Sequence, residues 1–403
     1  MSPAETASSL APLRLKKREE RRLRAGHLWV YSNEIEIRAT PLTDFAPGQP
    51  VRIEAHNGRP LGCGYVNPHS LICARLVSRD PDQVLDKSLL VHRLKVALSL
   101  RQRLYEQPCY RLCYGEADGL PGLIVDRYDD VLAVQLTTAG MEVLKEAVIA
   151  ALEQVLHPRG ILLRNDVEVR RREGLDTYVE TLGEVPEPVA LSENGARFEI
   201  SLQTGQKTGW FYDQADNRAR LRRYARGARV LDVFSYVGAW GVQAALGGAA
   251  AVTCVDSSRE ALARAEHNAA LNGVGERVET RQGDAFEVLK ALREAGASFD
   301  LVVLDPPAFI KRRKDIEAGT EAYQRLNQLA IRLLGRDGFL VTASCSHHMQ
   351  PEAFRRVVHR AARHVDRRLQ LLEWGQQGVD HPRHPAIVET DYLKAIYARL
   401  VRD

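Results

Sequence analysis

The stretch ARVLDVFSYVGAWGVQAALGGAAAVTCVDSS (228–258) decides the fold of the larger part of this chain. An apolar strand pattern, ARVLDVFS, leads through a glycine-bearing turn into a helix pattern that ends near Gly248, and a second strand pattern, AVTCVDSS, follows. This alternation predicts parallel strands joined by helices that cross the faces of one sheet. Ligands of such sheets bind at the carboxyl ends of the strands. Polar residues at those ends are therefore the candidates for a site.

The same alternation continues to the end of the chain. Further strand patterns are RVETRQGD (277–284), FDLVVLDPP (299–307), GFLVTASCS (338–346), LQLLEWG (369–375) and YLKAIYARLV (392–401), with helix patterns between them at 259–274, 285–296, 322–335 and 351–365. We expect an α/β domain over residues 189–403 with a mainly parallel, doubly wound, Rossmann-like sheet. A hairpin over residues 188–205, turning at Asn194-Gly195, leads into it.

Two smaller domains are predicted before this sheet. Short strand patterns at 27–37, 49–55, 60–67 and 71–78, separated by turns at Pro47-Gly48 and Asn57-Gly58, predict a small β barrel or sandwich over residues 1–79. A helix pattern at 85–108 is followed by strand patterns at 110–130 and 131–138, a helix pattern at 142–156, and strand patterns at 160–166 and 176–183. This order predicts an α+β middle domain over residues 80–188.

The composition is that of a globular protein without a membrane segment. The 403 residues suffice for two or three compact units, and 45% hydrophobic with 27% charged residues is typical of soluble proteins. Residues 1–13 lack the basic-then-apolar order of a signal peptide, so we expect a cytoplasmic protein. The six cysteines are scattered and form no C-x-x-C pair, so we expect free thiols and no metal site.

Basic residues are concentrated in two short stretches. The net charge is only +4, but residues 14–24 contain seven Lys or Arg against two Glu, and residues 311–314 read KRRK. A charge run is often only a solvated face, but phosphate groups of a nucleic acid are the alternative partner. The candidates for such contacts in the first stretch are Lys16, Lys17, Arg21 and Arg22.

Three strands of the predicted sheet end in an aspartate. Asp232 precedes the turn Phe234-Ser235-Tyr236-Val237-Gly238, Asp256 ends the second strand, and Asp284 ends the third. A carboxylate at the second strand can accept hydrogen bonds from both ribose hydroxyls, and one at the third can accept from an adenine amino group. Each acid could instead cap a helix, but all three at successive strand ends favour an adenosine ligand.

The missing phosphate loop decides between the adenosine ligands. The chain contains no G-x-x-x-x-G-K-[ST] and only an incomplete dinucleotide fingerprint, so S-adenosylmethionine is favoured over ATP and NAD. The fourth strand ends in Asp305-Pro306-Pro307-Ala308-Phe309. Two prolines make a stiff, extended turn, and an aromatic ring beside it can stack on a flat base. We therefore expect this loop to bind a nucleobase.

The fifth strand ends in Ser344-Cys345-Ser346, which brings a thiol to the same edge as Asp305. A buried core thiol is the alternative, and it is the interpretation that we favour for Cys63, Cys73 and Cys254. For Cys345 we expect a nucleophile, because a thiolate is strongly nucleophilic and the pKa of a cysteine thiol is easily lowered beside a cationic cofactor or basic residues.

The string TGQKTGWFYDQADNR (204–218), together with VLDVFSYVGAWG, CVDSS, GDAFEVL, LDPPAF and SCS, resembles the ribosomal RNA large-subunit methyltransferase I family. That resemblance implies an S-adenosylmethionine-dependent enzyme that forms 5-methylcytosine in 23S ribosomal RNA. KKREERRLRAGHLWVYSNEI (16–35) resembles the family's RNA-binding PUA domain, and GEADGLPGLIVDRYDD (115–130) resembles its middle domain. The residues that the resemblance and the strand ends place around the cofactor are Gln206, Thr208, Tyr212, Asp213, Asp232, Phe234, Ser235, Tyr236, Gly238, Asp256, Ser257, Asp284, Ala285 and Asp305.

One position departs from the wider class of RNA cytosine-C5 methyltransferases. Many of them carry a second cysteine just after the two prolines, where this chain has Ala308. Asp305 is then the nearest candidate for the base that removes the C5 proton. Two alternatives stay open: an enzyme that methylates an exocyclic amine of guanine or adenine, and an RNA-binding assembly factor without activity. The oligomeric state is open as well, with a homodimer as one alternative.

Overall fold

The computed structural model describes residues 10–402, so residues 1–9 of the predicted first domain lie outside it. The chain divides into two compact units. The first comprises residues up to Val189 with Leu202–Trp210 and Asp380–Thr390, and the second comprises Ala190–Ser201, Phe211–Val379 and the chain from Asp391. The boundaries of the three predicted domains stay a prediction.

A five-stranded sheet begins the first unit, in the order β1-β3-β4-β5-β2. Its elements are β1 (Ala11–Arg14), α1 (Glu20–Arg24), β2 (Trp29–Val30), β3 (Gln49–Glu54), β4 (Pro60–Val66) and β5 (Ala74–Ser78). The strand predicted at 27–37 is much shorter, because the chain turns into a 3-10 helix at Ser32–Glu34. The Glu34 carboxylate accepts hydrogen bonds from the Tyr31 N–H at 2.8 Å and from the Arg22 guanidinium at 2.7 and 2.9 Å, which stabilises this turn.

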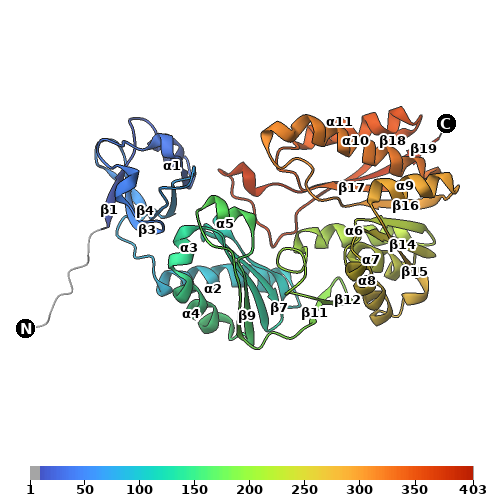
Figure 1. The fold of residues 1–403 in the computed structure, drawn as a ribbon, viewed down its shortest axis with the longest axis horizontal. Coiled ribbons are helices and arrows are strands. Elements are labelled where there is room, and N and C mark those ends of the chain that lie inside the picture. The colour runs from blue at the N-terminus through green and yellow to red at the C-terminus, as the bar shows by residue number, and fades with distance from the viewer. Residues whose placement is uncertain (1–9, 403) are drawn as a thin grey trace, which may run out of the picture. The chain divides into compact units, whose positions relative to one another are not determined.

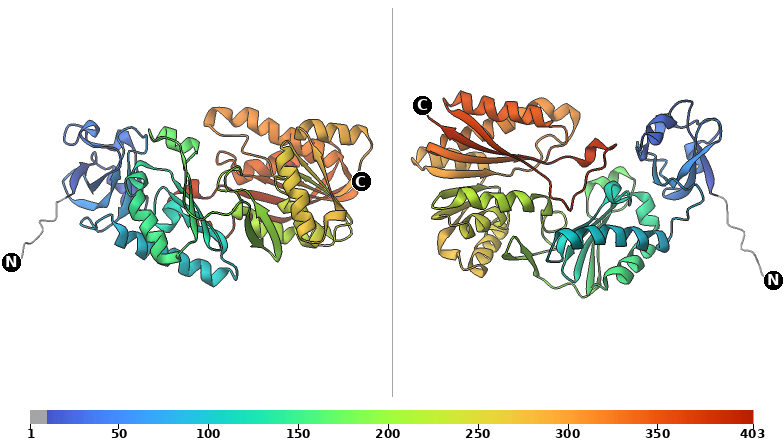
Figure 2. Two further views of the ribbon diagram at one scale, coloured as in Figure 1. Left: turned by 60° about the horizontal axis from the view of Figure 1, so that its bottom comes forward. Right: turned by 180° about the vertical axis from the view of Figure 1, so that it is seen from behind.

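A second five-stranded sheet completes the first unit, in the order β10-β9-β8-β7-β6. Its elements are α2 (Lys87–Leu104), β6 (Cys109–Tyr114), β7 (Leu123–Tyr128), β8 (Val131–Leu136), α3 (Ala139–Val143), α4 (Lys145–Leu156), β9 (Gly160–Arg164), α5 (Glu168–Arg172) and β10 (Val179–Gly183). The long pattern at 110–130 is two strands, separated by a 3-10 helix at Gly115–Asp118. Helices α2 and α4 pack together beside the sheet, as Figures 1 and 2 show.

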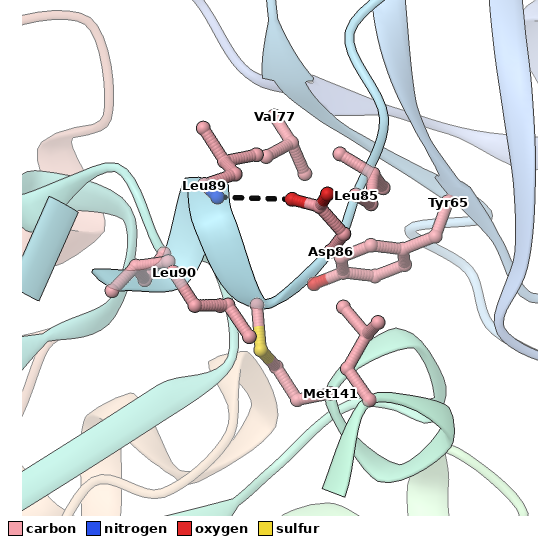
Figure 3. Close-up of a pocket in the computed structure, with 9 residues that line it drawn as sticks. Tyr65, Val77, Leu85, Asp86, Leu89, Leu90 and Met141 are labelled. Carbon is pink, nitrogen blue, oxygen red and sulfur yellow. Dashed lines mark hydrogen bonds between the residues drawn. The ribbon is translucent and has the colours of Figure 1, made fainter. Parts of the chain in front are cut away.

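The two sheets of the first unit are joined by buried side chains. Glu173 accepts hydrogen bonds from Asn67 at 2.9 Å, Ser70 at 2.8 Å and Arg75 at 3.0 Å. Figure 3 shows a small pocket at this junction, where Tyr65 and Val77 face Met141 and the start of α2, which Asp86 caps by accepting from the Leu89 N–H. Apolar side chains line most of this pocket, so it is a packing seam and does not carry the predicted chemistry.

The second unit contains a seven-stranded sheet in the order β15-β14-β13-β16-β17-β19-β18. Its strands are β13 (Arg229–Val233), β14 (Ala251–Asp256), β15 (Val278–Gln282), β16 (Phe299–Leu304), β17 (Leu334–Ser344), β18 (Arg368–Gln376) and β19 (Lys394–Val401). All pairings are parallel except those of β19, which runs antiparallel to β17 and β18. The predicted doubly wound, mainly parallel sheet is confirmed.

Helices cover both faces of this sheet. In Figure 1, α9 (Ala285–Glu294), α10 (Ile316–Arg332) and α11 (Pro351–His364) lie on one face. Helices α6 (Ala215–Ala225), α7 (Ala239–Leu246) and α8 (Arg259–Leu271) lie on the other. The predicted hairpin is β11 (Val189–Glu193) and β12 (Ala196–Ile200), and α6 was not predicted. Helix α6 is held by Arg218, whose buried guanidinium pairs with Glu193 of the hairpin.

Candidate active site

The carboxyl ends of β13, β14, β16 and β17 meet at one edge of the seven-stranded sheet. In the parallel register, Val233 lies beside Val255 on one side and Leu304 on the other, and Leu304 lies beside Thr342. The residues that follow these strands therefore come together at this edge. The tertiary structure thus gathers the strand-end residues that the sequence singled out.

The loop after β13 has an unusual backbone. Phe234, Tyr236 and Gly238 have φ angles of 66°, 49° and 82°, in the left-handed region that favours glycine. A Cβ at Gly238 would lie 2.9 Å from Ala265, so the loop packs too closely on α8 for any larger residue. Strained backbone of this kind persists where the surrounding structure holds it, and it is concentrated at ligand sites. This loop is the part predicted to wrap the methionine portion of the cofactor.

Asp232 is fully buried beneath this loop, with one oxygen bonded and one without a partner. Its Oδ2 accepts from the Gly241 N–H at 2.9 Å, whereas its Oδ1 has no hydrogen-bond partner. Burial, together with the negative charges of Asp305 and Asp256, raises the pKa of this carboxyl to about 8. A nearby positive charge would relieve this cost. The position therefore fits a cationic ligand such as S-adenosylmethionine.

Asp256 and Asp284 are both engaged by local backbone. Asp256 accepts from the Tyr236 N–H and the Ser258 N–H, each at 2.9 Å, and so ties the loop after β13 to the end of β14. Asp284 is exposed and caps α9 by accepting from the Phe286 and Glu287 N–H groups at 3.0 and 3.2 Å. Each carboxylate keeps acceptor capacity for a ligand. Their ribose and adenine roles stay predictions, as do those of the exposed Ser257 and the buried Ala285.

Asp305 is held by two side chains that the sequence did not single out. Gln214 Nε2 donates to Oδ1 at 2.9 Å, and Trp240 Nε1 donates to Oδ2 at 3.0 Å. Burial raises the pKa of this carboxyl; the Trp240 hydrogen bond opposes the rise, and the negative charge of Asp213 adds to it. Gln214 lies inside the string 204–218 and Trp240 inside VLDVFSYVGAWG, but only the fold brings them to the end of β16.

The thiol of Cys345 lies against the Pro-Pro loop. Its Sγ is 4.0 Å from the carbonyl oxygen of Pro306, and the residue is partly exposed, whereas the other five cysteines are buried. Pro307 is exposed at the same loop. The Phe309 ring packs on Tyr323 with a centroid distance of 4.7 Å, so part of it belongs to the core of this unit. Its stacking role toward a base stays a prediction.

The string 204–218 contributes residues to both units. Thr208 belongs to the first unit and is buried. Its hydroxyl donates a hydrogen bond to Asp126, and its carbonyl oxygen accepts one from the Tyr128 hydroxyl at 3.0 Å. Gln206, also in the first unit, is exposed. Tyr212 and Asp213 belong to the second unit, where the Asp213 carboxylate accepts from the hydroxyl of Tyr392. The cofactor roles of all four stay predictions.

The N-terminal basic residues differ in how much they contact the protein. Lys17 and Arg21 are exposed, and Lys16 is exposed although its Nζ donates to the Asn33 carbonyl at 2.8 Å. Arg22 is committed to Glu34, so its charge is already paired. The second basic stretch, residues 311–314, is exposed and follows the Pro-Pro loop.

Among the described residues, no helix is long and apolar enough to cross a membrane.

Comparisons with known proteins agree with this arrangement. The model of the PUA-like domain matches residues 13–79, and that of the S-adenosylmethionine-dependent methyltransferases matches residues 113–397. The "Ribosomal RNA large subunit methyltransferase I" of Aeromonas salmonicida is 38% identical over 392 residues, which cover 96% of this chain and 98% of that protein. The protein of the same name from Shewanella amazonensis is 36% identical, over 96% of this chain and 99% of its own length.

Solved structures share the fold over nearly the whole chain. A candidate methyltransferase from Streptococcus mutans has a TM-score of 0.81 at 22% identity, and covers 97% of this chain and 100% of its own. A candidate methyltransferase complexed with S-adenosylhomocysteine has a TM-score of 0.83 at 22% identity, with the same coverage. The predicted resemblance, fold class and cofactor are therefore confirmed. This chain belongs to the ribosomal RNA large-subunit methyltransferase I family of S-adenosylmethionine-dependent methyltransferases.

Proposed function

We propose that this chain methylates carbon 5 of a cytosine in 23S ribosomal RNA, with Cys345 as the covalent nucleophile. The observation that carries the proposal is the 4.0 Å separation between Cys345 Sγ and the Pro306 carbonyl oxygen, because a nucleophile and a base-binding loop are needed at one place. The names of the relatives and the match to a PUA-like domain support ribosomal RNA as the substrate. The exposed Lys16, Lys17 and Arg21 would contact its phosphates.

The thiol supplies what the target carbon lacks. Carbon 5 of cytosine is a poor nucleophile. Addition of the Cys345 thiolate at carbon 6 raises the electron density at carbon 5. Bound S-adenosylmethionine supplies the methyl group as a sulfonium. Carbon 5 then forms its bond to the methyl carbon as the bond between that carbon and the sulfonium sulfur breaks, so that S-adenosylhomocysteine is the leaving group. A general base next removes the proton from carbon 5, and the bond between carbon 6 and the cysteine sulfur breaks to return the thiolate. The net change replaces one hydrogen of the base by a methyl group.

Asp305 is our candidate for the base. The neutral donors Gln214 and Trp240 hold its two oxygens in place and so orient the carboxylate. Its raised pKa makes it a stronger proton acceptor than an ordinary carboxylate. The target cytosine would first be extruded from its RNA stem or loop. Pro306, Pro307 and the partly exposed Phe309 ring would then hold this cytosine in place. Cys345 and Asp305 would then act on opposite ends of the same carbon–carbon bond.

The decisive experiment removes the thiol. Cys345→Ala should keep the affinity for cofactor and RNA yet lose methylation of 23S RNA, whereas the matched control Cys109→Ala should methylate normally because that thiol lies in the first unit. Wild type should form a covalent complex with RNA that contains 5-fluorocytidine, whose fluorine cannot leave as a proton. Full methylation by Cys345→Ala would contradict the proposal and favour methylation of an exocyclic amine.

Mass spectrometry of ribosomal RNA from cells with and without the gene identifies the product. We expect one 5-methylcytosine to disappear in the deletion strain and to return with the wild-type gene but not with Cys345→Ala. A lost N-methylated purine would support the amine-methylating alternative. An unchanged set of modified nucleotides, with a defect in ribosome assembly, would support the assembly factor.

A further inference from the structure

Lys394 is the first residue of β19 and lies directly beside the end of β17. In the antiparallel register it pairs with Ser344, the residue before Cys345. Its Nζ donates to the carbonyl oxygen of Ser346 at 2.7 Å, so the side chain reaches past Cys345 to the residue after it. The two contacts bracket the proposed nucleophile. Lys394 was not singled out in the sequence, because 49 positions separate it from Cys345.

The side chain is buried without a carboxylate partner. Lys394 is only 5% exposed, and its two hydrogen-bond acceptors are neutral carbonyl oxygens, those of Ser346 and Tyr392, both at 2.7 Å. Among residues 10–402, no Asp or Glu forms an ion pair with it. Lysine is almost never fully buried unless it is paired, because desolvation of an ammonium is costly. A simple tether between carbonyls would be made at lower cost by a neutral amide.

The electrostatics point to Cys345 as the missing counterpart. Burial lowers the pKa of Lys394 to about 8, while Cys345 and then Asp391 act in the opposite direction. Asp391 is exposed, so solvent screens its charge, and Cys345 has the larger effect of the two on the buried ammonium. Tyr323 of α10, whose pKa is raised by burial, is neutral near pH 7. Asp305 lies at the end of β16, and a negative charge on its carboxylate opposes ionisation of the thiol.

We propose that the ammonium of Lys394 is a positioning residue that stabilises the thiolate of Cys345 and keeps it ionised for attack on the base. The proton of the thiol leaves to solvent, and Lys394 forms no covalent bond. This inference rests on the proposed function, in which the Cys345 thiolate is the nucleophile. The cost of burying Lys394 is then offset by the negative charge that the reaction requires.

The pH dependence of alkylation tests this directly. Full-length protein is treated with iodoacetamide at several pH values, and the rate at Cys345 is read by mass spectrometry of its peptide; the other five cysteines are buried. In Lys394→Met we expect the midpoint of reactivity to rise by at least about one pH unit, and the rate near pH 7 to fall about tenfold. Lys394→Arg should recover part of the rate.

Two further variants separate charge from tethering. Lys394→Gln keeps a donor for the carbonyl oxygens but removes the charge, so it should behave like Lys394→Met; it also decides the question if the methionine variant does not fold. Lys290→Met, at a partly exposed position of α9 where the lysine pairs with Glu287, should leave the midpoint unchanged. In methylation assays Lys394→Met and Lys394→Gln should lose kcat near neutral pH, with KM for RNA retained, and regain activity at higher pH.

An unchanged alkylation midpoint in folded Lys394→Gln would overturn the inference and leave Lys394 as a tether. That result is independent of whether Cys345 is the nucleophile. If Cys345→Ala methylates fully while the midpoint still depends on Lys394, the proposed function fails and the electrostatic coupling stands. If Cys345→Ala is inactive and the midpoint does not move, the inference about Lys394 fails alone.

Discussion

Replacing Asp232 by Asn should make the unliganded protein more stable and its cofactor binding weaker. Asp232 is fully buried, and its Oδ1 has no partner. The asparagine oxygen can still accept from the Gly241 N–H, as Oδ2 does at 2.9 Å, so the change removes the charge and little else. The wild-type chain thus carries a buried acid whose ionisation is unfavourable in the absence of a cationic ligand.

The magnitude follows from the pKa. The folded value of about 8 lies above the ordinary value of 3.8, so the folded protein keeps a proton that the unfolded chain has lost. Between these two values the stability contributed by Asp232 falls as the pH rises, by about 1.4 kcal/mol per pH unit. Asn does not titrate. The difference in unfolding free energy between Asp232→Asn and wild type should therefore grow in favour of the variant from pH 5 to pH 8, by a few kcal/mol.

Urea denaturation of both unliganded proteins at pH 5, 6, 7 and 8 measures this difference, and the other titrating groups cancel because both proteins share them. Calorimetry at pH 7.5 should show weaker binding of S-adenosylmethionine to the variant, since a cationic ligand favours the ionised wild-type carboxylate. A difference in stability that is the same at pH 5 and pH 8 would refute the raised pKa. Equal affinity in both proteins would refute the interpretation of the unpaired oxygen as part of the cofactor site.

Two other predictions concern cofactor and RNA. Asp256→Ala should weaken S-adenosylmethionine binding by roughly 1.5 to 3 kcal/mol, because two charge-assisted hydrogen bonds to a ribose are lost; unchanged affinity in calorimetry would remove the ribose assignment. Replacing Lys16, Lys17 and Arg21 together by Gln should flatten the dependence of RNA affinity on salt concentration, since fewer counterions are released. Arg22 is left intact in that variant because it pairs with Glu34, and an unchanged slope would make the stretch an ordinary solvated face.

Local sequence was sufficient where the determining interactions are local. The period of apolar residues located the strands of the parallel sheet. Because ligands of such sheets bind at the carboxyl ends of the strands, the strand ends then indicated Asp232, Asp256 and Asp305. It was insufficient where a side chain bends the backbone. The strand expected at 27–37 ends at Val30, because Glu34 forms hydrogen bonds that stabilise a turn. From the sequence, helix capping is the alternative role of Asp284, and its hydrogen bonds to the start of α9 agree with that alternative.

By itself the sequence determined the alternating strands and helices, the acids at the strand ends, the Pro-Pro loop and a cysteine at the next strand end. Only the tertiary structure decided which side chains surround them. Gln214 lies directly before α6, Trp240 lies in α7, and Lys394 begins β19. Each of them reaches the site through a contact between segments that are far apart in the chain. No local period encodes such contacts, because they depend on strand order and register. The antiparallel insertion of β19 next to β17 places a buried ammonium beside Cys345.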